Sequence, residues 1–178
     1  MIQKCSKERI LEVFFKEPTT IHFIREISRK INLAHTSVRK VIKDLEKADI
    51  IKKKESKPFT GYIANRENDI FIFMKRVYNL ESLYGMNEFI VQNYYPQLFV
   101  VFGSYSRGED VETSDIDVLL ISKTKKEVNL KKYEKELKRE INMMIIKTLD
   151  ELDEIMQKRI MNGFVMYGGF WWILRYLE

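Results

Sequence analysis

The first third of the chain alternates apolar and polar positions in a way that predicts helices followed by a hairpin. Apolar residues at helical spacing predict three amphipathic helices, in residues 6–15, 23–31 and about 36–48. Short runs rich in β-branched or alternating apolar residues predict three strands, in residues 19–22, 50–55 and 61–64. We expect Thr36 or Ser37 to cap the third helix. The predicted order is therefore helix, strand, helix, tight turn, helix and hairpin.

The rest of the chain predicts a second module of strands and helices. Apolar runs predict three strands, in residues 98–102, 114–121 and 141–147. Helical spacing predicts a connecting helix and three more, in residues 66–79, 83–95, 128–138 and 149–160. The last segment, residues 161–178, is rich in aromatic residues and predicts a helix-turn piece, with Trp171 or Trp172 marking an interface. The expected fold class is α+β.

Candidate chemistry lies where the first two strands of this module meet polar residues. Asp115 and Asp117 are two residues apart, so they share one face of a strand, roughly 6–7 Å from each other. Two carboxylates on one face suit a hard cation such as Mg²⁺. The turn at Gly103-Ser104 permits close backbone approach, and its free N–H groups favour an anion. Together these residues predict a site for a metal-bound triphosphate.

These motifs, Gly103-Ser104 followed after ten residues by Asp115-Ile116-Asp117, resemble the nucleotidyltransferase superfamily of DNA polymerase β, in particular its minimal bacterial and archaeal members. The resemblance covers about residues 82–160 and implies a small mixed sheet that binds ATP or another NTP with Mg²⁺ or Mn²⁺. It implies nucleotide binding by Gly103, Ser104 and Arg107. Arg107 is equally well explained by pairing with Asp110 or Glu112.

The third carboxylate of that family falls on a later strand, and the matching position here is Asn142. An amide offers one carbonyl oxygen to a metal, but it is uncharged and cannot act as a base. The expected metal ligands are therefore Asp115, Asp117 and Asn142. Glu140 shares a strand face with Asn142 and is the alternative third acid, against the simpler interpretation of an exposed strand-end residue. The catalytic candidates are Asp115, Asp117 and Glu140.

Charge divides the chain in the same place as the predicted elements. Residues 1–67 hold 16 Lys and Arg against 9 Asp and Glu, a balance of +7, whereas the rest holds 15 against 17, a balance of −2. The first module resembles winged helix-turn-helix transcription regulators, whose second motif helix enters the major groove of double-stranded DNA. A helical bundle with a solvated basic face is the alternative. The expected DNA-binding residues are His35, Thr36, Ser37, Arg39, Lys40, Lys43, Lys53 and Lys54, with Lys52 and Lys57 also on the wing.

Composition adds limits to this scheme. Apolar residues make up 45% of the chain, which is enough for a core. The single cysteine, Cys5, excludes an internal disulfide. We see neither a signal peptide nor a membrane span, and we expect a cytoplasmic protein. The expected division is a winged helix in residues 1–66, a connecting helix in residues 67–81, and a nucleotidyltransferase-like domain with an aromatic tail in residues 82–178.

Two functions remain open at this point. The first is a DNA-binding transcription regulator whose second domain binds NTP and Mg²⁺ as a sensor or is a catalytic relic. The second is an active transferase that moves AMP from ATP onto a protein or small-molecule hydroxyl, as antitoxins of the minimal family do to a partner toxin. Asn142 favours the first, and the intact Gly-Ser and Asp-x-Asp motifs imply nucleotide binding in both. We also expect a homodimer, because one half-site discriminates poorly between DNA sequences.

Overall fold

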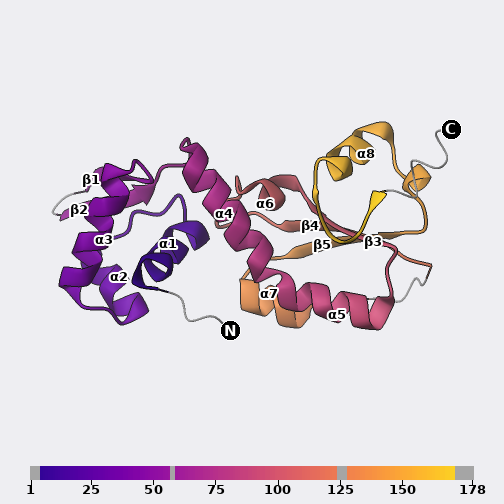
Figure 1. The fold of residues 1–178 in the computed structure, drawn as a ribbon, viewed down its shortest axis with the longest axis horizontal. Helices are drawn as coiled ribbons and strands as arrows, with labels where there is room; N and C mark the ends of the chain where they lie inside the picture. Colours follow the sequence, from indigo (N-terminus) through magenta and orange to yellow (C-terminus); the bar gives the residue numbers. More distant parts are fainter. Residues whose placement is uncertain (1–4, 57–58, 124–127, 171–178) are drawn as a thin grey trace. The chain divides into compact units, whose positions relative to one another are not determined.

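The computed structural model describes residues 5–56, 59–123 and 128–170. The chain forms two compact units, residues 1–78 and residues 79–178, and each is described by itself (Figure 1). The expected wing residue Lys57 and both tryptophans lie outside the described residues. No helix in the described part of the chain has both the length and the apolar character that a membrane span requires.

The first unit holds three helices and a two-stranded antiparallel sheet. The helices are α1 (Ser6–Lys16), α2 (Ile24–Ile31) and α3 (His35–Lys47), and the strands are β1 (Ile51–Ser56) and β2 (Phe59–Ala64). Their order agrees with the sequence pattern. The strand predicted at residues 19–22 was wrong, because only His22 pairs there, in an isolated bridge to Tyr62. The capping prediction was also wrong: α3 begins at His35 after Ala34, so Thr36 and Ser37 lie inside its first turn.

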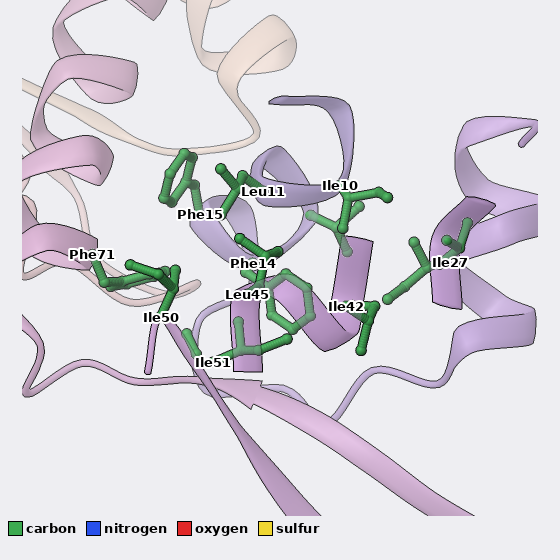
Figure 2. Close-up of a cluster of buried hydrophobic side chains, with 13 residues drawn as sticks. Ile10, Leu11, Phe14, Phe15, Ile27, Ile42, Leu45, Ile50, Ile51 and Phe71 are labelled. Carbon is green, nitrogen blue, oxygen red and sulfur yellow. The ribbon is translucent and has the colours of Figure 1, made fainter. Parts of the chain in front are cut away.

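One apolar cluster holds the first unit together (Figure 2). Phe14 of α1, Ile27 of α2 and Ile42 of α3 are fully buried in it. Each such side chain contributes about 1.5–3 kcal/mol by leaving water. His22 is also fully buried, and its ring packs edge-on against Phe14 at 5.1 Å between centroids. The apolar sides of the three helices, which the helical periodicity predicted, thus pack into one shared core.

A four-stranded mixed sheet organises the second unit. Its strands are β3 (Leu98–Phe102), β4 (Ile116–Ile121), β5 (Ile141–Ile146) and β6 (Phe164–Gly168), in the order β5-β4-β3-β6. β4 runs antiparallel to β3 and parallel to β5. Every residue of β3 is buried, which fits a central strand covered on both faces.

Helices cover both faces of this sheet (Figure 1). α5 (Tyr84–Tyr94) and α7 (Lys131–Leu137) pack on one face, where Met86 and Ile90 of α5 are buried. α8 (Glu154–Met161) packs on the other face through Ile160. Before them in sequence, α4 (Asp69–Ser82) leads out of the first unit. Helices and mixed sheet together confirm the α+β class.

Several predicted elements of this unit need correction. The prediction of a helix-turn piece in residues 161–178 was wrong for the part that the structure describes, because residues 164–168 form β6 and pair with β3. The predicted final helix is broken into η1 (Leu149–Glu151) and α8, and the helix predicted at residues 128–138 is confined to α7. Asp115 immediately precedes β4 instead of opening it. The Gly-Ser turn is the first turn of a short helix, α6 (Gly103–Arg107).

Candidate functional site

Strand direction brings the polar motifs of the second unit to one end of the sheet. β3 ends where β4 begins because the two are antiparallel, and Phe102 pairs with Asp117. β5 begins at the same end because it runs parallel to β4, and its residue Asn142 pairs with Asp117 on the other side. Gly103, Asp117 and Asn142 therefore come from three neighbouring strand ends.

The amide of Asn142 lies against both carboxylates of the Asp-x-Asp motif. Its Nδ2 atom donates to Asp115 Oδ2 at 3.1 Å and, over a longer 3.5 Å, to Asp117 Oδ1. Asp115 and Asn142 are exposed, and Asp117 is half-buried. The two negative side chains thus converge on one neutral N–H₂ group, which partly offsets their mutual repulsion.

Position 103 requires a glycine because its backbone lies so close to Asp117. Its φ of 72° lies in the left-handed region, and a Cβ at this position would lie 2.5 Å from Asp117 Oδ2. Ser106 fixes the same turn, because its buried hydroxyl donates to the Gly103 carbonyl at 2.9 Å. Ser104 follows Gly103 at the start of α6 and is half-buried. The backbone of the Gly-Ser motif therefore lies directly beside the carboxylate.

A buried ion pair holds the loop that joins these motifs. Arg139 Nη2 lies 2.9 Å from Asp110 Oδ2, with the Arg139 side chain 7% and the Asp110 side chain 0% exposed. Arg139 also donates to the carbonyls of Val111 and Ser114, just before Asp115. Asn79 donates to the other oxygen of Asp110 at 2.7 Å. This network was not predicted from the sequence, although an Arg three residues before Asn142 and an Asp between the two motifs were visible signals.

Tyr105 of α6 joins the same network. Its carbonyl accepts from Asn79 Nδ2 at 2.9 Å, and its hydroxyl lies 2.9 Å from Ser82 Oγ. The Arg139 guanidinium lies 5.6 Å from the centroid of its ring. Burial raises the pKa of the Tyr105 phenol, and the hydrogen bond to Ser82 partly opposes that effect. This phenol therefore serves as a neutral, structural group.

The ion pair expected for Arg107 has a different partner. Arg107 Nε donates to Glu109 Oε2 at 2.8 Å, on a half-exposed surface. Asp110, one of the two expected partners, instead pairs with Arg139. Two adjacent acids thus differ in burial, and the buried one takes the buried cation. A role for Arg107 toward nucleotide stays a prediction.

Glu140 lies next to the site without facing Asp117 in the strand register. Its carbonyl accepts from Ile116 N at 2.9 Å, and the residue opposite Asp117 is Asn142. Glu140 and Asn142 line the same shallow hollow, which has a volume of about 420 Å³. A catalytic role for Glu140 stays a prediction, and the register favours Asn142 as the third group of the cluster.

The donor set at this end of the sheet fits a single hard cation. Asp115 and Asp117 supply carboxylates, and rotation of the Asn142 amide would turn its carbonyl oxygen inward in place of the N–H₂ group. Among the described residues, no group of three or more His, Cys, Asp and Glu could hold a metal. The groups that would hold Mg²⁺ here are two carboxylates and an amide.

The expected DNA-binding residues of the first unit lie on its surface, and their role toward DNA stays a prediction. All six expected residues of α3 are exposed: His35, Thr36, Ser37, Arg39, Lys40 and Lys43. Lys53 and Lys54 on β1 are exposed as well. Lys52 differs, because its Nζ donates to Glu67 at 2.7 Å, which raises the pKa of Lys52 and lowers that of Glu67. Among the hairpin cations that the structure describes, Lys53 and Lys54 are therefore best suited to an external anion.

Comparison with known proteins identifies the second unit. Residues 83–162 match the family model for the nucleotidyltransferase domain. The match spans the Gly-Ser motif, the Asp-x-Asp motif and Asn142. The chain therefore contains a nucleotidyltransferase-type domain, and domains of this type generally use an NTP and a divalent metal ion.

Two further comparisons add little to this result. One solved structure is similar, described as "a putative nucleotidyltransferase from Sulfolobus solfataricus", at 22% sequence identity and a TM-score of 0.33 over 55% of this chain and 86% of that one. No curated protein matches the chain. The family match rests on residues 83–162 and does not extend to the first unit.

Proposed function

We propose that this protein is a DNA-binding transcription regulator whose nucleotidyltransferase-type domain binds an NTP with Mg²⁺ and does not turn it over efficiently. The observation that carries this proposal is the Asn142 amide between Asp115 and Asp117. Nucleotidyl transfer of the two-metal kind stabilises both the attacking and the leaving oxygen. Two carboxylates and an amide provide charge for one cation, and they lack a base for the attacking hydroxyl.

Binding of a nucleotide requires fewer functional groups than its transfer does. The Gly103 backbone beside Asp117 and the Ser104 side chain at the start of α6 are the groups we assign to the phosphates. Asp115, Asp117 and the Asn142 carbonyl would hold Mg²⁺, which supplies the charge that neutralises the phosphates. The expected ligand is ATP or another NTP.

DNA binding is assigned to the first unit on its element order and its charge. Three helices followed by a hairpin, with a single bridge from His22 to Tyr62, are consistent with a winged helix-turn-helix. In that arrangement α3 would enter the major groove through its exposed residues from His35 to Lys43, and Lys53 and Lys54 would contact phosphates.

Active transfer of AMP to a hydroxyl, with a partner toxin as one acceptor, is the second candidate. The position of Glu140 favours it, because this acidic residue lines the same shallow hollow as Asn142. In this case Glu140 would supply the missing acid, and Glu140→Gln would abolish transfer. The same variant should leave NTP binding unchanged.

A thermal-shift panel of NTPs with Mg²⁺ or Mn²⁺ tests the proposal for the second unit. A ligand that binds only the folded protein raises its melting temperature. We expect a metal-dependent shift in the wild type that disappears in Asp115→Asn/Asp117→Asn, together with no transfer of label from α-³²P NTP to protein. Absence of any shift would exclude the nucleotide site. Steady labelling of an acceptor would contradict the sensor function and support the second candidate, an active transferase.

Salt-dependent DNA binding tests the proposal for the first unit. Each phosphate contact contributes about −0.9 to the slope of log K against log salt. We expect Lys40→Ala and Lys43→Ala each to reduce the slope by about 1 on a random duplex. The control is Lys132→Ala, an exposed lysine on α7 of the other unit. Equal slopes in all variants would remove α3 from the DNA interface.

A further inference from the structure

One side of α4 carries a row of large apolar side chains that the described structure leaves exposed. Ile70 is 59%, Phe73 65% and Val77 50% exposed. Their spacing of three and four residues aligns them along one side of the helix. Phe71, roughly on the opposite side, is 1% exposed and belongs to the core of the first unit. The helix (Figure 1) therefore has two apolar sides, of which one is used.

The row has the spacing of paired helices. Apolar residues that alternate three and four apart form the seam of two-helix contacts, in which side chains of one helix pack between those of the other. Single exposed apolar residues are ordinary on protein surfaces, whereas a contiguous apolar patch marks an interaction site. An apolar row is also unsuited to nucleic acid, whose surface is anionic.

We propose that a second copy of this chain covers the row, with the two α4 helices antiparallel about a two-fold axis that passes near Phe73. This arrangement sets Phe73 against its symmetry mate and Ile70 against Val77 of the second copy. A two-fold interface must be complementary to itself, and the row meets that condition.

The charges beside the row support this occupant. Asp69 precedes Ile70 and is exposed, and Arg76 precedes Val77 and is half-buried. The antiparallel register sets Asp69 of each copy near Arg76 of the other, so opposite charges meet at both ends of the seam. Three apolar residues per copy form a smaller contact than a standard stable interface. We therefore expect a reversible dimer at micromolar concentration.

This dimer is independent of the proposed function, since it rests only on α4. It would nevertheless carry two α3 surfaces in one particle, which is what a two-fold DNA site requires. Loss of DNA binding and loss of dimerisation can be told apart, because variants on α3 and variants on α4 are separate.

Sedimentation equilibrium of the full chain across a hundredfold concentration range tests the proposal. We expect the wild type to associate and Phe73→Glu to stay monomeric, with an unchanged circular dichroism spectrum and thermal melt. The matched control is Ile155→Glu on α8, because Ile155 is 74% exposed and lies in the other unit. A wild type that stays monomeric throughout, or a Phe73→Glu protein that still associates, overturns the proposal.

Cysteine cross-linking tests the register. The exposed Cys5 is first replaced in Cys5→Ser, which keeps a good residue at the N-cap of α1. In that background we expect Phe73→Cys to form a disulfide dimer under mild oxidation, and Ile70→Cys to do so only together with Val77→Cys. Dimers of Ile70→Cys alone indicate parallel helices and overturn the antiparallel pairing.

Discussion

Replacing Asn142 by aspartate should convert the amide-bridged cluster into a metal-dependent one. The change keeps the size of the side chain and puts a negative oxygen where the Nδ2 atom now lies, 3.1 Å from Asp115 Oδ2 and 3.5 Å from Asp117 Oδ1. At these distances each new pair of unit charges repels by about 1.2–1.3 kcal/mol in water-like surroundings. Asp115 and Asn142 are exposed and Asp117 is half-buried, so the water-like value is the lower limit of the repulsion. Asn142→Asp should therefore lower the free energy of unfolding by about 2.5 kcal/mol or more without metal.

The same repulsion should be relieved when a divalent cation binds. About 2.5 kcal/mol of relief corresponds to roughly 50- to 100-fold tighter binding. Urea unfolding in EDTA measures the first effect, and titration of free Mn²⁺ by electron paramagnetic resonance measures the second. The matched control is Asn129→Asp: Asn129 is exposed before α7, and its Oδ1 accepts from Lys131 N, a role that aspartate can keep.

The reasoning fails if Asn142→Asp binds Mn²⁺ no more tightly than the wild type. It also fails if both aspartate variants lose equal stability in EDTA, since a general increase in negative charge would then explain the result. Gain of NTP transfer in Asn142→Asp alone would show that one missing carboxylate separates this domain from turnover.

Three further predictions concern the supports of the site. Gly103→Ala should lower the free energy of unfolding by about 1–2 kcal/mol because of the positive φ, and it should weaken Mn²⁺ binding by displacing Asp117. The control Gly85→Ala in α5 should be neutral or stabilising, because a Cβ there would meet only a Tyr133 ring carbon at 4.0 Å. Urea unfolding and Mn²⁺ titration of both variants check this. Asp110→Asn should lower the free energy of unfolding by about 3–5 kcal/mol because it leaves the buried Arg139 without its counterion, and an unchanged urea midpoint would contradict it. Burial raises the pKa of Tyr105, so its contribution to stability should be complete below the ordinary tyrosine pKa of about 10 and be lost as pH rises through the folded-state value. The ultraviolet difference spectrum between wild type and Tyr105→Phe should show that the Tyr105 phenol ionises at a higher pH than an ordinary tyrosine.

Local periodicity determined most of the elements in this protein. α1, α2, α3, α5, β3 and β5 lie close to where the spacing of apolar residues predicted them, because burying one side of a helix or a strand imposes a repeat that is readable over a few residues. The parity argument predicted that Asp115 and Asp117 point to the same side, and the resemblance to nucleotidyltransferases implied Asn142 as their neighbour. The strand register then paired Asn142 with Asp117.

Tertiary structure decided the features that depend on distant partners. Residues 164–168 form a strand only because β3 offers them a free edge, which their own aromatic composition does not reveal. Asp110 pairs with Arg139, and its neighbour Glu109 pairs with Arg107, because only Asp110 is buried where Arg139 arrives. The exposure of Phe73 beside the burial of Phe71 follows in the same way from what packs on each side of α4. A sequence specifies which residues must leave water, and the fold determines which of them find a partner within the chain.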